Sequence, residues 1–144
     1  MKNNFKIGER YYSALINAAF STILIVDFEV KEVWKNGNIV ASSTYNLNPY
    51  YITEAIKDIP TESSYILNPT QRVYQFAAKT IEEVYTKIEK QKSTNLKYAE
   101  KLIKQYNELS IWQKIKYFFK EDAFYKAYMK ALIEYRLIKK YENK

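Results

Sequence analysis

The stretch that decides the fold class is residues 22–45, which read TILIVDFEVKEVWKNGNIVASSTY. Its first half is rich in β-branched and aromatic residues, and apolar side chains alternate along it. The alternating apolar residues are Leu24, Val26, Phe28 and Val30. Asn36-Gly37 follows, a pair that favours a tight turn in which both residues have positive φ. We therefore predict a β-hairpin whose second strand runs over residues 39–45.

The chain on either side of this hairpin has a helical pattern. Residues 9–20, ERYYSALINAAF, predict a short helix before it. All glycines and prolines lie at or before Pro69, so the last 75 residues contain neither of the strongest helix breakers. Apolar residues recur there at spacings of three and four. The pattern predicts four helices, over residues 70–92, 95–109, 111–120 and 122–141.

Local signals place several of the helix starts. The tripeptide Leu-Asn-Pro occurs at 47–49 and at 67–69, where Asn can cap a helix whose first turn tolerates Pro. Gln71 lies three residues after Asn68, and Gln113 lies three residues after Ser110, as in a capping box. The predicted fold class is α+β and predominantly α. An N-terminal helix and a β-hairpin pack on a C-terminal bundle of about four helices.

The amino-acid composition excludes several kinds of chemistry. The 144 residues include no His and no Cys, which removes His or Cys nucleophiles and the usual zinc sites. Two glycines cannot build a phosphate-binding loop. We therefore expect no cofactor, no metal and no catalytic residues, and a binding protein rather than an enzyme.

Charge is distributed unevenly along the chain. The 23 Lys and Arg residues exceed the 16 Asp and Glu residues, which gives a formal charge of +7. Residues 1–69 carry 6 basic and 7 acidic side chains, whereas residues 70–144 carry 17 and 9. At this length we expect a single domain, 1–144, in which 70–144 is the basic helical part.

The targeting signals are weak. Residues 11–26 are apolar and follow three basic residues, but polar residues interrupt the stretch, which is shorter than the ~20 residues that span a bilayer. We expect no membrane span and a cytoplasmic location. The absence of Cys leaves the compartment open.

The lysine-bearing helices predict contact with a polyanion, because a concentration of positive charge attracts nucleic acid. Tyr98, Tyr117 and Tyr125 lie among the lysines and could stack on bases. The favoured partner is nucleic acid or a nucleoprotein complex, and the alternative is that the lysines only solvate the helices. The candidate residues are Lys97, Lys101, Lys104, Lys114, Lys116, Lys120, Lys126 and Lys130.

The last predicted helix has two apolar lines. Its core face holds Phe124, Ala127, Tyr128, Ala131, Tyr135 and Ile138. A second line, Met129, Ile133 and Leu137, lies on roughly the opposite side. Two lines indicate either burial on both sides or an association surface. The second hypothesis is therefore a protein–protein adaptor or inhibitor, as a homodimer or with another protein partner.

Two further interpretations remain open. Residues 111–120, IWQKIKYFFK, have the composition of an interfacial membrane helix, although a core-facing helix shows the same pattern. Asp27, Glu29 and Lys31 alternate on the first predicted strand, and Glu-x-Lys on a strand resembles metal-dependent nucleases. The nuclease pattern lacks its usual upstream Asp, and cross-strand ion pairs would explain the same residues.

Overall fold

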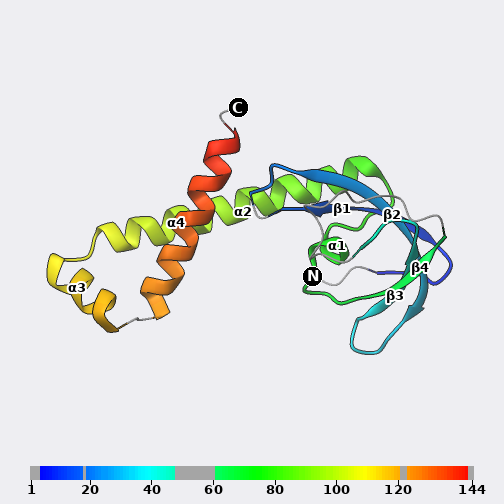
Figure 1. The fold of residues 1–144 in the computed structure, drawn as a ribbon, viewed down its shortest axis with the longest axis horizontal. Helices are drawn as coiled ribbons and strands as arrows, with labels where there is room; N and C mark the ends of the chain where they lie inside the picture. The colour runs from blue at the N-terminus through cyan, green and yellow to red at the C-terminus, as the bar shows by residue number, and fades with distance from the viewer. Residues whose placement is uncertain (1–3, 18, 48–60, 121–122, 143–144) are drawn as a thin grey trace. The chain divides into compact units, whose positions relative to one another are not determined.

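The computed structural model describes residues 4–17, 19–47, 61–120 and 123–142. Within these ranges the chain forms four strands and then four helices (Figure 1). The strands are β1 (Arg10–Ile16), β2 (Ile23–Val33), β3 (Ile39–Ser43) and β4 (Ser63–Leu67). The helices are α1 (Arg72–Gln75), α2 (Ile81–Asn107), α3 (Ile111–Lys120) and α4 (Ala123–Glu142). The fold class is therefore α+β, as predicted.

The chain divides into two compact units. Unit 1 comprises Met1–Asn17 and Thr22–Ile88, and unit 2 comprises Ala18–Ser21 and Glu89–Lys144. The boundary falls inside α2, so unit 1 holds the sheet, α1 and the first turns of α2. Unit 2 holds the rest of α2 together with α3 and α4. That the whole chain is one functional domain stays a prediction.

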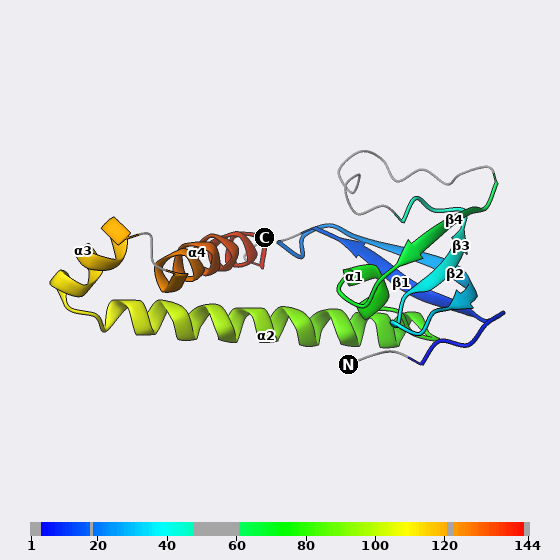
Figure 2. The same ribbon diagram turned by 90° about the horizontal axis from the view of Figure 1, so that it is seen from below.

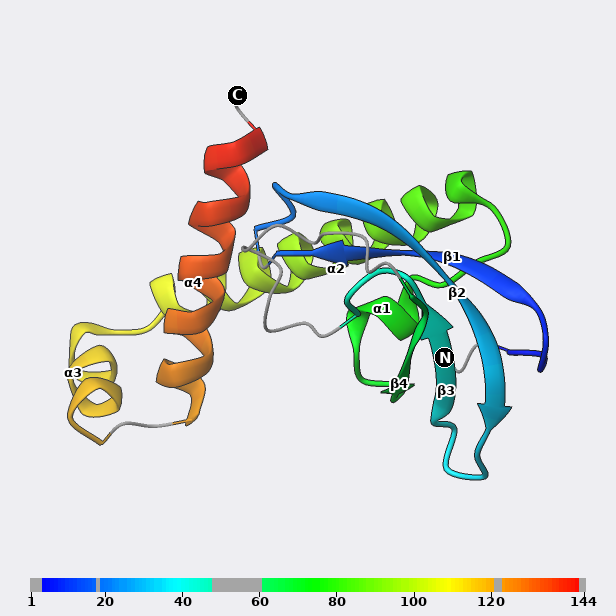
Figure 3. The ribbon, with the colours of Figure 1, turned by 45° about the vertical axis from the view of Figure 1, so that its right-hand side comes forward.

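The sheet of unit 1 is an antiparallel meander in the order β1-β2-β3-β4. β2 pairs with β1 from Ile23 to Glu29 and with β3 from Glu29 to Val33. The register with β3 shifts between Val30 and Glu32, which is the mark of a β-bulge and bends the strand. Figure 3 shows the resulting curve of β2.

The predicted hairpin is present as β2 and β3, but its turn differs from the prediction. The N–H of Gly37 donates to the carbonyl of Trp34 at 3.0 Å, and the N–H of Trp34 donates to the carbonyl of Asn38 at 2.8 Å. Gly37 has a φ of 93°, whereas among described non-glycine residues only Phe20 has a positive φ. The connection is thus a three-residue loop with glycine at its left-handed position, rather than a two-residue turn.

The prediction of an N-terminal helix over residues 9–20 is wrong, because Arg10–Ile16 forms β1. All seven residues of β1 pair with β2, and Tyr12 exchanges two backbone hydrogen bonds with Ala78 on its other side, at 2.8 and 2.9 Å. The Ser13 hydroxyl donates to the carbonyl of Val73 at 2.5 Å. The helical propensity of residues 10–16 is weak, so these hydrogen bonds to distant residues determine that the segment forms a strand.

One hydrophobic cluster of unit 1 includes alternate residues of β2, and it confirms the predicted alternation of that strand. Val26, Phe28 and Val30 are buried there, and Leu24 packs against them. Aromatic rings extend the same cluster, since Phe5 lies with its ring centroid 4.9 Å from that of Tyr11. Residues of β3, β4, α1 and the segment after α1 belong to the same cluster: Ile39, Ala41, Leu67, Val73, Tyr74 and Ala77.

The predicted helix over residues 70–92 is divided in two. α1 ends at Gln75, and α2 begins at Ile81. The intervening residues have other partners, because Phe76 and Ala77 are buried and Ala78 bonds to β1. A continuous helix would withdraw these groups from the sheet.

Of the two hydrogen bonds that make a capping box, one is present at Asn68. The N–H of Asn68 donates to Oε1 of Gln71 at 3.0 Å, as a capping box requires. The Asn68 side chain, however, accepts from the N–H of Thr70 at 3.0 Å instead of from Gln71. The first Leu-Asn-Pro, at 47–49, lies partly outside the described residues.

The predicted break between residues 92 and 95 is also wrong. α2 continues without interruption for 27 residues (Figure 2). Its start is capped by Thr80, whose Oγ1 accepts from the N–H of Glu83 at 3.2 Å. Since the sequence contains no Gly or Pro after Pro69, nothing local interrupts the helix. The predicted bounds of α3 and α4 agree with the structure to within one residue.

The core of unit 2 is formed where α4 packs on α2. Ala99 and Leu102 of α2 meet Ala131 of α4. One turn farther along α2, the rings of Tyr106 and Tyr128 stack with their centroids 3.8 Å apart. Phe124, Ala127 and Tyr135 border this cluster, and Ile138 is buried, which confirms the predicted core face of the last helix.

Candidate nucleic-acid interface

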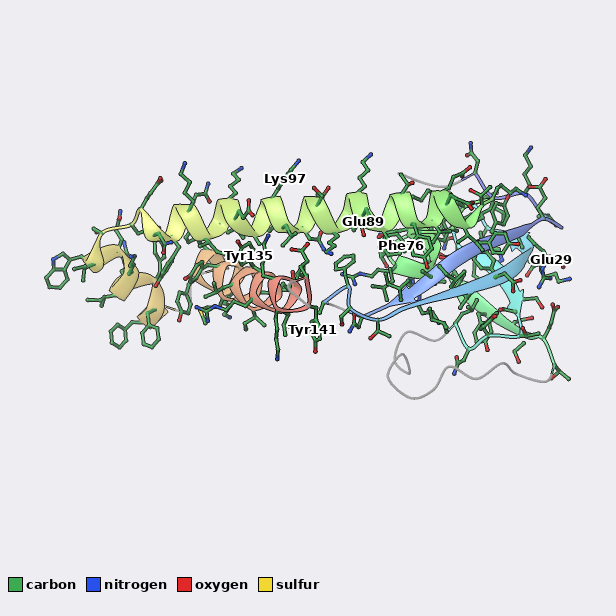
Figure 4. The ribbon with its side chains drawn as sticks, turned by 90° about the horizontal axis from the view of Figure 1, so that it is seen from above. Glu29, Phe76, Glu89, Lys97, Tyr135 and Tyr141 are labelled. Atoms are coloured by element: carbon green, nitrogen blue, oxygen red, sulfur yellow. The ribbon has the colours of Figure 1, made fainter. Side chains whose placement is uncertain are left out.

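Four lysines of α2 share one face of the helix. At 100° per residue, their side chains leave the axis within about 60° of one another and extend over about 21 Å. We call them the lysine row: Lys90, Lys97, Lys101 and Lys104. All four are exposed, and they lie opposite the buried Ala99 and Leu102. Figure 4 shows Lys97 on the side of α2 that points away from α4.

Acidic residues border the lysine row: Glu100 lies beside Lys101, and Glu83 and Glu108 lie on the same face beyond its two ends. Ser93 and Thr94 lie between Lys90 and Lys97, and both are small and exposed. Within the described part of the chain, no carboxylate lies within 4.0 Å of an ammonium group of the lysine row. Glu100 and Lys104 have the i,i+4 spacing of a helical ion pair, but the two side chains do not form one. The row therefore presents its charge to solvent.

The predicted lysines of α3 have different surroundings. Lys114 is half-buried, and its Nζ lies 5.4 Å from the ring centroid of Tyr106, a cation–π contact. Lys116 is exposed on the far side of the same helix. The side chain of Lys120 lies outside what the structure describes. None of these residues extends the lysine row.

The predicted lysines of α4 occupy yet another surface. Lys126 and Lys130 are exposed on α4, and Lys130 borders a hollow that Asn95 and Tyr98 of α2 also line. The candidate residues are thus distributed over α2, α3 and α4, and only Lys97, Lys101 and Lys104 gather on one face. Whether the other candidate lysines contact nucleic acid stays a prediction.

Of the three tyrosines considered for base stacking, one is well exposed. Tyr98 is 58 % exposed and lies about 90° from the centre of the lysine row. Tyr117 packs on Phe124 with 5.8 Å between ring centroids, and Tyr125 packs on Phe118 at the same distance. Tyr98 is therefore the aromatic side chain that a ligand on α2 could reach.

Sequence reasoning missed Lys90. The predicted break after residue 92 placed it on a different helix from Lys97. In one continuous helix, Lys90, Lys97 and Lys104 are spaced by seven residues, which is almost two whole turns. This seven-residue spacing in the sequence could have identified Lys90 as a member of the row.

The apolar residues of α3 are exposed, whereas a helix that faces a core buries its apolar residues. The helix starts with the predicted capping box, in which the N–H of Gln113 donates to Oγ of Ser110 at 3.2 Å. Its apolar residues lie in one sector, about 120° wide at 100° per residue. We call this the apolar sector of α3: Ile111, Trp112, Ile115, Phe118 and Phe119. Trp112 is 81 % exposed and Phe119 is 77 % exposed.

The second apolar line of α4 is also exposed. Met129, Ile133 and Leu137, the α4 stripe, are 36 %, 55 % and 38 % exposed. Tyr128 and Ala131 on the other side of the helix are buried. Since unit 2 covers only one side of α4, the stripe is available to a partner.

The charged residues of β1 and β2 form ion pairs with one another. Arg10 lies 3.7 Å from Asp27 and 3.3 Å from Glu62, and Lys31 pairs with Glu29. The hydroxyl of Ser42 donates to Glu62 at 2.9 Å, and this hydrogen bond, followed by Arg10, lowers the pKa of Glu62. Among the described residues, no group of three or more carboxylates could hold a metal ion. The arrangement is that of cross-strand ion pairs on a sheet face.

Comparison of the chain with known protein families, with curated proteins and with solved structures finds no match in any of the three. In the part of the chain that the structure describes, no helix is both long enough and apolar enough to cross a membrane.

Proposed function

We propose that this chain is a small, non-enzymatic, cytoplasmic binding protein that associates with nucleic acid through the lysine row of α2. The observation that supports this proposal is the alignment of four exposed lysines on one helix face, none of which forms an ion pair within 4.0 Å with a carboxylate of the described residues. Unit 2 carries 14 Lys and Arg residues against 7 Asp and Glu, so the surrounding field is positive as well. A row about 21 Å long can follow the phosphates of one strand.

The proposal predicts a defined salt dependence. Each phosphate that is neutralised releases a counterion, so the logarithm of the affinity falls linearly with the logarithm of the salt concentration. Four contacts to duplex DNA predict a slope of about −3.6, or roughly a 150-fold loss of affinity for a fourfold rise in salt. Contacts of this kind carry no base specificity.

The experiment is fluorescence anisotropy with a labelled DNA duplex and a labelled RNA strand over a range of salt concentrations. The double variant Lys97→Gln/Lys101→Gln should halve the slope on the duplex, to about −1.8, because two contacts are lost. The matched control is Lys6→Gln/Lys35→Gln, which makes the same change in net charge in unit 1. It should bind as the parent does.

Two results would contradict the proposal. One is the absence of binding to either nucleic acid at low ionic strength. The other is an equal loss of affinity in the control variant, because net charge alone, and not the lysine row, would then explain the binding.

A second candidate function is that of a protein–protein adaptor or inhibitor that uses the α4 stripe. The exposure of Ile133, at 55 %, supports it, because a β-branched aliphatic side chain in water gains from burial in an interface. The partner would be a second copy of this chain or another protein.

Substitution of Ile133 by Lys tests this candidate. We expect Ile133→Lys to shift the protein toward the monomer in sedimentation velocity, or to lose a partner in a pulldown. The control Ile7→Lys places the same charge at another exposed isoleucine. An Ile133→Lys variant that is folded and unchanged in both measurements would remove the α4 stripe from consideration.

A further inference from the structure

We infer that α3 is an interfacial helix that binds the surface of a membrane containing anionic phospholipids. This inference is independent of the proposed nucleic-acid contact, because it rests on different residues. The apolar sector of α3 is the most exposed group of large apolar side chains in unit 2, with Ile111 at 74 % in addition to Trp112 and Phe119. Their burial is a source of binding free energy that unit 2 does not use.

The attachment of α3 leaves most of this sector exposed; of its five residues, Phe118 contacts α4, with 5.8 Å between its ring centroid and that of Tyr125. Tyr117, on the other side of the helix, is half-buried and packs on Phe124 of α4. Lys114 lies over the ring of Tyr106. The helix is thereby held to unit 2 by the residues around its apolar sector, while Trp112 and Phe119 point to solvent.

The dimensions suit a helix that lies in the plane of the interface. Ten residues extend about 15 Å, which is half of what a bilayer core requires. A sector of about 120° can enter the boundary between headgroups and acyl chains while the remaining side chains stay in water. Tryptophan and phenylalanine are the side chains that such helices use at this depth.

The charges around the sector favour an anionic lipid over other occupants. Residues 111–120 contain three lysines and no acidic residue. Lys114 and Lys116 leave the helix about 40° beyond the two edges of the sector. Lys116 is exposed and would meet lipid headgroups, while Lys114 adds positive charge from its place over the Tyr106 ring. A second copy of α3 would bring lysines against lysines. Nucleic acid would leave the aliphatic Ile111 and Ile115 without a stacking partner.

Trp112 provides a direct reporter. The chain has two tryptophans, so the variant Trp34→Phe makes Trp112 the only one. With vesicles of mixed phosphatidylserine and phosphatidylcholine, we expect its emission to shift to the blue and to become protected from acrylamide. With phosphatidylcholine alone the shift should be weak, and added salt should reduce it on the anionic vesicles.

Variants in the same background locate the contact. Ile115→Ser/Phe119→Ser should lower the vesicle affinity about tenfold or more, because it removes two apolar side chains from the sector. The matched control Tyr85→Ser/Tyr98→Ser removes two exposed aromatic side chains of α2 and should leave the affinity unchanged. Lys97→Gln/Lys101→Gln should keep the blue shift, which separates this inference from the proposed nucleic-acid contact.

Four results would overturn the inference. The first is no shift with anionic vesicles, and the second is an equal shift with neutral ones. The third is a Trp112 that is already protected in the free protein in a concentration-dependent way, which would identify a second copy as the occupant. The fourth is protection by nucleic acid without protection by vesicles.

Discussion

Units 1 and 2 bury their apolar residues in different ways. In unit 1, Phe28, Val30 and Ile39 have no exposed surface at all. In unit 2, two of the three residues in the central cluster are alanines, Ala99 and Ala131. An alanine buries little apolar area, so the packing of α4 on α2 contributes less free energy than the sheet core does.

The two units also differ in charge and in the use of apolar side chains. Unit 1 carries nine basic and nine acidic residues, whereas unit 2 has the whole net charge of +7. Unit 2 also exposes the apolar sector of α3 and the α4 stripe. The comparison indicates that unit 1 has an apolar core of large side chains and no net charge, whereas unit 2 has a smaller core and carries the positive charge.

The largest effects should follow from the cores of the two units. Phe28→Ala should lower the free energy of unfolding by about 3–5 kcal/mol, and Leu102→Ala by about 2 kcal/mol, because a larger side chain leaves a larger cavity. Urea unfolding followed by circular dichroism measures both. Ile66→Ala, at an exposed position of β4, should change stability little.

Hydrogen exchange of the Leu102→Ala variant tests the separation of the units. We expect faster exchange in α4 while β2 stays protected. An equal loss of protection in both elements would show that the two units unfold together. The two cores would then not have separate free energies of unfolding.

A smaller effect should come from the stacked tyrosines of unit 2. A double-mutant cycle of Tyr106→Ala and Tyr128→Ala should give a coupling of about 0.5–1.5 kcal/mol. The control cycle combines Tyr85→Ala with Tyr128→Ala and should give none, because these rings are not in contact. A coupling near zero for the stacked pair would mean that α4 is held to α2 by its alanine and leucine contacts alone.

The smallest effect should be the dependence of stability on pH. The hydrogen bond from Lys79 lowers the pKa of Glu9, the Ser42 hydroxyl lowers that of Glu62, and Lys92 lowers that of Glu142. A folded-state pKa below the ordinary 4.5 means that the stabilisation is present above that pH and is lost as the pH falls through the folded value. The urea midpoint should therefore decline on acidification below about pH 4.5.

Glu62→Gln separates this contribution from general acid unfolding. The variant should have a lower midpoint at neutral pH and a shallower decline on acidification, since one of the three carboxylates no longer titrates. An unchanged slope would mean that the ion pairs of Glu62 contribute nothing measurable, as is common for exposed pairs.

Part of the candidate surface was predictable from sequence. The exposed lysines of α2 and the apolar composition of residues 111–120 are features of residue type and spacing. The direction in which α3 faces was not predictable, because a core helix and an interfacial helix have the same pattern. Tyr117 decides it by packing on Phe124, a contact that depends on the position of α4.

By itself, the sequence determined the features that depend on neighbours along the chain. These include the alternation of Val26, Phe28 and Val30, the glycine in the β2–β3 turn, the capping box at Ser110 and the core face of α4. Only the tertiary structure decided that residues 10–16 form a strand and that a helix does not run through residues 76–80. Both outcomes depend on backbone hydrogen bonds between Tyr12 and Ala78, which are 66 residues apart, and a local pattern holds no information about such a distant partner.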